Sequence, residues 1–153
     1  MSQVSRARGE ECAGCDSHWL SCTTASSDEP SAAAALAEAF AAFARPLSEA
    51  PSGETAQAFR ARYLSQAHRA APGEGCPAAA LGADVALAAP ALRAAFGAGV
   101  AQVADGLAGD GGTEARERAL RHLSMMVGAM VLARACPDDL AAEILAACAA
   151  RPA

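Results

Sequence analysis

Alanine makes up 45 of the 153 residues of this chain, and only six residues are aromatic. Alanine has the highest intrinsic helix propensity, and its small side chain lets helix backbones approach one another closely. A chain of this length forms one domain and buries roughly 70% of the surface that its unfolded form exposes. The sequence therefore predicts an all-α fold, a closely packed bundle of about six helices.

The charged residues argue against a basic DNA-binding face. The chain has 17 acidic residues and 12 arginines, no lysine, and a net charge of −5. Binding to nucleic-acid phosphates depends on clustered cationic side chains, which this balance does not favour.

Neither a membrane span nor a signal peptide is expected. The apolar stretch at residues 123–133 is shorter than the roughly 18 to 20 residues that cross a membrane, and an arginine flanks it on each side. The first residues continue from Arg6 and Arg8 to Glu10 and Glu11 instead of to an apolar run. We therefore expect a cytoplasmic protein without membrane contact, in which the six cysteines stay reduced.

The first predicted helix follows from the spacing of four large apolar residues. They recur at i, i+4, i+7 and i+11, which places them on one helix face: Leu36, Phe40, Phe43 and Leu47. Pro30-Ser31 can start this helix, and Pro46 is expected to end or kink it.

Prolines and glycines predict the boundaries of the central helices. After the turn at Pro51-Ser-Gly53, one helix is expected over residues 54–69, with its aromatic side chains on one face. Cys76-Pro77 begins a further helix, and Pro90 begins the next, because proline at the first helical position gives up an N–H that has no partner there.

The last two predicted helices are the most apolar part of the chain. Thr113 is expected to cap a helix that runs to Ala135, and Pro137-Asp-Asp139 places acidic residues at the positive end of the final helix. Residues 123–133 are apolar on all sides, which predicts burial on every side. Because two helices of one small domain offer too little cover, we expect a second copy of the chain to supply the rest.

The most distinctive sequence lies between Arg62 and Phe96. It reads Arg62-Tyr-Leu-Ser-Gln-Ala-His-Arg-Ala-Ala-Pro-Gly-Glu-Gly-Cys-Pro77 and continues through Ala-Ala-Ala-Leu-Gly-Ala-Asp84. This segment resembles the effector-binding half of TetR/AcrR-type bacterial transcriptional regulators, in the subgroup that has a Gly-Cys-Pro helix start followed by a helix of small residues. The resemblance extends over roughly residues 50–150. Outside this segment it consists mostly of residue patterns that are typical of helices in general.

The resemblance implies a homodimer with an inducer pocket. In TetR-type regulators the last two long helices pack against their symmetry mates as a four-helix bundle, and the central helices enclose a small-molecule effector. Residues 31–153 would form this effector-binding and dimerisation domain, with no cofactor. The implied dimer interface consists of Leu123, Val127, Met130, Val131, Leu140, Ile144 and Leu145. The implied ligand pocket consists of Phe40, Phe43, Phe59, Tyr63, Phe96, Met125 and Met126.

The N-terminal 30 residues depart from this family. A TetR-type regulator begins with a helix-turn-helix domain that reads DNA, whereas residues 1–30 have no helical period. We interpret them as disordered or as a frameshifted remnant of that domain. If the codons for residues 18–26 are read two bases further on, codon degeneracy permits the sequence Leu-Ala-x-Leu-Tyr-His-Arg-Phe. This sequence is close to the signature with which the DNA-binding domain of the family ends. On this interpretation the chain binds DNA only if a helix-turn-helix domain is restored or a partner supplies one.

The same N-terminal segment contains a competing motif. Four potential ligands, with the spacing Cys-x-x-Cys-x-x-His-x-x-x-Cys, could hold Zn²⁺ in a small zinc or thiol protein: Cys12, Cys15, His18 and Cys22. Only two residues separate Cys15 from His18, and no apolar framework surrounds them, so we expect no metal there.

Several other residues have both a functional and a structural interpretation. Cys76 is either a reactive thiol or a small buried residue at a helix start. Tyr63 and His68 either bind a ligand or serve as a core tyrosine and a surface histidine. The methionines at 125, 126 and 130 suit a pocket, an interface or a plain core.

No catalytic constellation is visible in the sequence. The three histidines lie in different segments, and no paired carboxylates stand in an apolar setting. We therefore expect a regulator that responds to an apolar ligand, not an enzyme. The alternative, from a different functional class, is a dimerisation or ligand-binding module that does not act on DNA.

Overall fold

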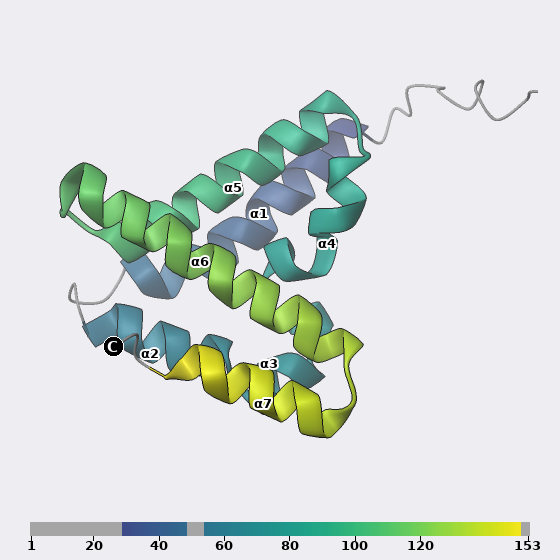
Figure 1. Cartoon of the computed structure of the whole chain (residues 1–153). Helices are drawn as coiled ribbons and strands as arrows, with labels where there is room; N and C mark the ends of the chain where they lie inside the picture. Colours follow the sequence, from purple (N-terminus) through teal and green to yellow (C-terminus); the bar gives the residue numbers. More distant parts are fainter. Residues whose placement is uncertain (1–28, 49–53, 151–153) are drawn as a thin grey trace, which may run out of the picture.

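The computed structural model describes residues 29–48 and 54–150, which form seven α-helices and one 3₁₀ turn (Figure 1). The prediction of an all-α fold is confirmed for this part of the chain. In chain order the elements are α1 (Glu29–Ser48), α2 (Glu54–Tyr63), α3 (Gln66–Ala70), η1 (Pro72–Glu74), α4 (Pro77–Ala86), α5 (Pro90–Ala108), α6 (Gly112–Ala135) and α7 (Asp138–Ala149).

Helix α6 is the centre of the arrangement. It packs against α3, α4, α5 and α7, and Figure 1 shows it crossing the molecule between α5 and α7. Its inner face contributes Leu123, Met126 and Met130 to the core, and all three are buried. Alanines are buried where the helices meet, including Ala133 of α6 and Ala141 of α7, so the small side chains do permit close packing.

Helices α1 and α5 form the most extensive pair and run parallel, side by side (Figure 1). Phe40 of α1 lies over Gly99 of α5, and one level further along both helices Leu47 lies over Gly106. A Cβ atom at position 99 would come within 2.2 Å of the Phe40 ring. This close approach requires glycine at position 99, and the fully buried Phe40 fills the space that glycine leaves.

Most predicted helix boundaries agree with the structure. Pro77 and Pro90 occupy the first helical positions of α4 and α5, and two aspartates occupy the first turn of α7. Pro46 lies in the last turn of α1, two residues before the helix ends. The loss of one N–H there removes only one of the last hydrogen bonds of the helix.

Two expected boundaries are wrong. The single helix expected over residues 54–69 is divided into α2 and α3, because the Ser65 hydroxyl accepts a hydrogen bond from the His68 N–H at 3.1 Å and caps a new helix. Thr113 is not the cap of α6, which begins one residue earlier at Gly112 without a side-chain cap. Gly112 has a φ of 69°, a left-handed conformation that suits glycine.

We predict that Gly99→Ala destabilises the protein by roughly 1–3 kcal/mol, because the added methyl overpacks the α1–α5 contact. Gly97→Ala is the matched control, since position 97 is on the same helix and nothing lies within 4 Å of its added methyl. It should stabilise α5 by about 0.5–1 kcal/mol through helix propensity. Urea unfolding of both variants measures the difference, and equal effects would contradict the packing assigned to Phe40.

Candidate functional site

Four aromatic rings from α1, α2 and α3 gather at one place in the fold. Phe43 makes edge-to-face contacts with Phe59 and Tyr63, at centroid separations of 5.5 and 6.1 Å. His68 stacks on Phe43 and meets Tyr63 edge-on at 4.6 Å. Such geometries are the favourable ones for aromatic pairs. The four rings therefore hold α1, α2 and α3 together.

A cavity of about 190 Å³ opens beside this aromatic cluster. Aromatic side chains form part of its wall, and α2, α3 and the 3₁₀ turn supply most of the rest. Its lining residues are Phe43, Arg62, Tyr63, Ser65, Ala67, His68, Ala71 and Glu74. The volume and the flat aromatic walls suit a small planar molecule.

His68 is fixed by a hydrogen bond at each ring nitrogen. Its Nδ1 lies 2.7 Å from the Tyr63 carbonyl oxygen, and its Nε2 lies 3.1 Å from the backbone nitrogen of Cys76. The carbonyl can only accept and the backbone N–H can only donate, so both bonds together require a neutral ring with the proton on Nδ1. A protonated ring would lose the bond to Cys76.

The Gly-Cys-Pro sequence has a structural explanation at this point. A Cβ atom at position 75 would lie 2.4 Å from the His68 Nε2, so only glycine allows the ring to approach. Cys76 then donates its N–H to His68 while its side chain is fully buried, and Pro77 begins α4. This burial agrees with the structural interpretation of Cys76, whereas His68 is half-buried and is not a surface histidine.

Burial lowers the pKa of His68 below its usual value of 6.5, because the charged ring would lose hydration. The hydrogen bond to the Tyr63 carbonyl opposes this shift, while the nearby guanidinium groups of Arg134 and Arg62 lower the pKa further. The neutral ring that the hydrogen bonds require is therefore also the form that its surroundings favour.

Tyr63 places a hydroxyl group inside the protein beside the cavity. Its side chain is 2% exposed, and no partner completes a hydrogen bond with the hydroxyl among the described residues. Burial and, after it, the neighbouring Cys76 thiol raise the pKa of Tyr63 above its ordinary value. The hydroxyl is therefore protonated, and it retains an unused capacity to donate a hydrogen bond.

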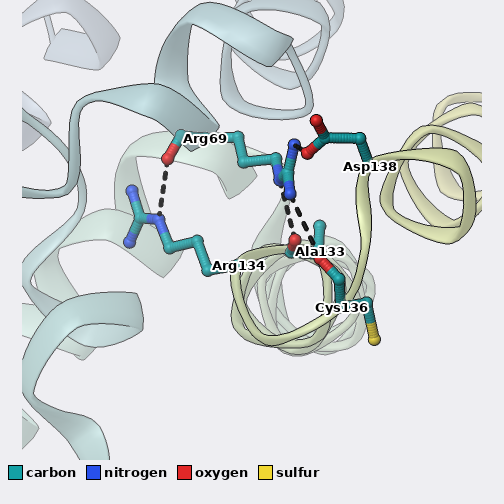
Figure 2. A network of polar contacts seen from close by, with 5 residues as sticks. All are labelled: Arg69, Ala133, Arg134, Cys136 and Asp138. Atoms are coloured by element: carbon teal, nitrogen blue, oxygen red, sulfur yellow. Dashed lines mark hydrogen bonds and ion pairs between the residues drawn. The ribbon is translucent and has the colours of Figure 1, made fainter.

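Two arginines join this site to the C-terminal helices (Figure 2). Arg134 of α6 donates to the carbonyl oxygens of His68 at 2.9 Å and Arg69 at 3.4 Å, at the end of α3. In the reverse direction, Arg69 donates to the carbonyl oxygens of Ala133 at 2.7 Å and Cys136 at 3.2 Å, at the end of α6. Each helix end is thus capped by an arginine of the other helix, which satisfies carbonyls that lack intrahelical partners.

Arg69 also contacts the first turn of α7. Its guanidinium group lies 2.8 Å from the Asp138 carboxylate (Figure 2). Asp138 is almost fully exposed, so solvent weakens this ion pair. The hydrogen bonds that the Arg69 guanidinium group donates to the carbonyl oxygens of Ala133 and Cys136 are partly buried. They therefore contribute more to the stability of the junction than the ion pair does.

Only part of the predicted ligand pocket lies at this cavity. Phe43 and Tyr63 line it, and Phe59 packs behind them. The remaining predicted residues lie elsewhere: Phe40 and Phe96 form a separate edge-to-face pair at 5.4 Å, Met126 lines a second cavity, and Met125 is half-buried at the edge of the core.

The residues expected at a dimer interface divide into two groups. Leu123, Met130 and Leu145 are buried within the chain itself, because α6 has neighbours on several sides. Val131 and Leu140 are exposed, and Val127 and Ile144 are half-buried. Much of the expected burial of residues 123–133 is therefore supplied within the chain, while Val131, Leu132 and Leu140 leave apolar side chains of the α6–α7 hairpin open to solvent. Cover of these side chains by a second copy stays a prediction.

The other expected features concern the N-terminal segment and the membrane. Cys12, Cys15, His18 and Cys22 lie outside the described residues, and within residues 29–48 and 54–150 no cluster of three or more potential metal ligands occurs. None of the helices in this part of the chain is long and apolar enough to cross a membrane.

Several residues that shape the site were not predicted from the sequence. Arg69 and Arg134 were not singled out, and neither were the cavity residues Ser65 and Glu74. Only Ser65 had a local signal, because serine commonly caps a helix by accepting a hydrogen bond from the backbone N–H three residues further on. An arginine that caps a helix distant in the chain has no local sequence pattern by which it could be recognised.

No protein-family model matches the chain, and no curated protein gives a significant match. The resemblance to TetR-type regulators therefore depends on the residues between Arg62 and Phe96 themselves.

We predict that His68 makes the stability of the protein depend on pH. Because its folded pKa is lowered, the unfolded chain binds the proton first as the pH falls. The contribution of the neutral His68 ring to the free energy of unfolding is fully present above about pH 6.5, the pKa of histidine in the unfolded chain. It is lost as the pH falls from there to the lower pKa of His68 in the folded chain. The free energy of unfolding of the wild type should therefore decrease over this range relative to His68→Gln. Parallel stability curves for the wild type and His68→Gln would contradict the assignment.

Proposed function

We propose that this chain is the ligand-binding and dimerisation domain of a TetR-type transcriptional regulator, a repressor that acts in the cytoplasm and responds to a small apolar molecule. DNA binding would then require a helix-turn-helix domain from outside the described residues or from a partner. The proposal is supported by the segment between Arg62 and Phe96, by the cavity beside Phe43 and Tyr63, and above all by the open face of the last two helices.

The open face of the α6–α7 hairpin is the observation on which the proposal depends. Val131 is 45% exposed and Leu140 is 44% exposed, and Leu120 and Leu132 of α6 are exposed as well. In Figure 1 none of the other described helices lies in front of α6 and α7. Exposed apolar patches on a folded domain commonly mark interaction sites, because water contact with them is unfavourable. A second copy would bury the same patch on both chains at once.

The cavity offers a route by which a ligand could affect this face. It is lined by α3 residues, and α3 is joined to the end of α6 and the start of α7 through Arg69 and Arg134. A ligand that shifts α3 would change these hydrogen bonds and thereby the geometry of the hairpin. Allosteric regulation of this kind is a coupling free energy between two sites.

A DNA-free dimerisation module is the alternative that the charge favours. The net charge of −5 opposes contact with phosphates unless a basic reading domain is supplied. Both versions of the proposal include the same dimer and the same cavity. They differ only in whether the dimer controls a DNA-reading domain.

We predict that the purified protein is a dimer at about 10 µM and that Val131→Glu or Leu140→Glu weakens the dimer by at least tenfold, or about 1.4 kcal/mol. A carboxylate at either position would have to be desolvated in the interface. Leu87→Glu is the control, because Leu87 is 93% exposed and follows α4, so that it is not part of the α6–α7 hairpin. Sedimentation velocity measures all four proteins. A well-folded monomeric wild type would contradict the proposal.

A further inference from the structure

We infer that a second cavity, between α2, α5 and α6, binds a small organic anion with an apolar body. The cavity has a volume of about 230 Å³ and shares no lining residue with the cavity beside Tyr63. Three of its lining residues, Arg60, Arg118 and His122, have side chains with nitrogen donors. The inference goes beyond the proposed function, because it requires neither a dimer nor a ligand at the first site.

Arg60 supplies a rigid guanidinium group. One of its terminal nitrogens donates to the carbonyl oxygens of Cys148 at 2.5 Å and Ala150 at 2.6 Å, which fixes the side chain against the end of α7. Its Nε is buried and has no acceptor among the described residues. A buried N–H without a partner is unfavourable, so the Arg60 guanidinium group retains a donor that the described chain does not satisfy. Because the group is already held in place, binding would cost little side-chain entropy.

Arg118 and His122 lie one turn apart on α6 and line the same cavity. The nearest acidic partner of Arg118 is Glu114, at 3.9 Å, and both side chains are largely exposed. Such an exposed pair contributes little and competes weakly with a bound carboxylate. His122 adds an imidazole N–H donor whether its ring is neutral or charged.

The remaining lining determines the class of anion. Leu107 of α5 and Met126 and Ala119 of α6 are apolar, and Met126 is 1% exposed. Inorganic phosphate could use the nitrogen donors but would leave this apolar wall uncovered. A monocarboxylate with a short hydrocarbon body satisfies both parts of the cavity, because its charge meets the guanidinium groups and its body meets the wall.

Titration calorimetry of the full chain with hexanoate, hexanamide and inorganic phosphate tests the inference. Hexanoate and hexanamide have similar shapes and differ in charge, so hexanoate should bind about tenfold more tightly or better, and phosphate should bind more weakly than hexanoate. The inference would be overturned if hexanamide bound as tightly as hexanoate or if phosphate bound more tightly than hexanoate. It would also be overturned if the dissociation constant of hexanoate were above about 10 mM, which corresponds to a binding free energy on the order of 3 kcal/mol.

Variants then assign the binding to this cavity. Arg118→Gln should weaken hexanoate about fivefold or more and leave hexanamide unchanged, because an exposed guanidinium can be removed without loss of the fold. Arg121→Gln is the matched control: it removes the same charge from the same helix at a residue that does not line the cavity. Ala56→Leu, which fills the cavity at a half-buried position, should weaken hexanoate without a change of charge. If Arg121→Gln weakens hexanoate as much as Arg118→Gln, or if Ala56→Leu has no effect, the site is not this cavity.

Discussion

Arginine side chains that cap the ends of other helices hold this alanine-rich fold together. Arg69 caps the end of α6, Arg134 caps the end of α3, and Arg60 caps the end of α7. The last carbonyls of a helix have no intrahelical partner, and alanine side chains cannot supply one. In a chain without lysine, the long arginine side chain fills this role and adds a favourable charge at the negative end of the helix dipole.

The site depends most strongly on the reciprocal pair. Helix α3 has only five residues, too few for a helix to be stable alone, so its position is set by the Ser65 cap at one end and Arg134 at the other. His68 lies within this helix and depends on its geometry to reach the Tyr63 carbonyl and the Cys76 N–H. The aromatic cavity is therefore built on a short helix that the α6–α7 junction keeps in place.

The periodic features of the sequence predicted the helices well, and the tertiary contacts less well. The stripe from Leu36 to Leu47 and the prolines at 77 and 90 are local signals, and the structure contains the helices that they predict. The burial of Leu123 and Met130 within one chain depends on neighbours from four other helices, which no local pattern encodes. Likewise, Phe43 and Tyr63 were expected in a pocket, but the separation of Phe40 and Phe96 from it results from the packing of α1 on α5.

A double-mutant cycle on Arg69 and Arg134 tests most directly whether the reciprocal caps act as one unit. Urea unfolding at one fixed protein concentration would compare the wild type, Arg69→Gln, Arg134→Gln and the double variant. Each single change should cost about 1–3 kcal/mol, because it leaves partly buried carbonyls without donors. If the loss of either arginine already loosens the junction, the destabilisation of the double variant should be smaller than the sum of the two single destabilisations. The difference should be at least about 0.5 kcal/mol. Losses that add within about 0.3 kcal/mol would show two independent caps and would contradict this account.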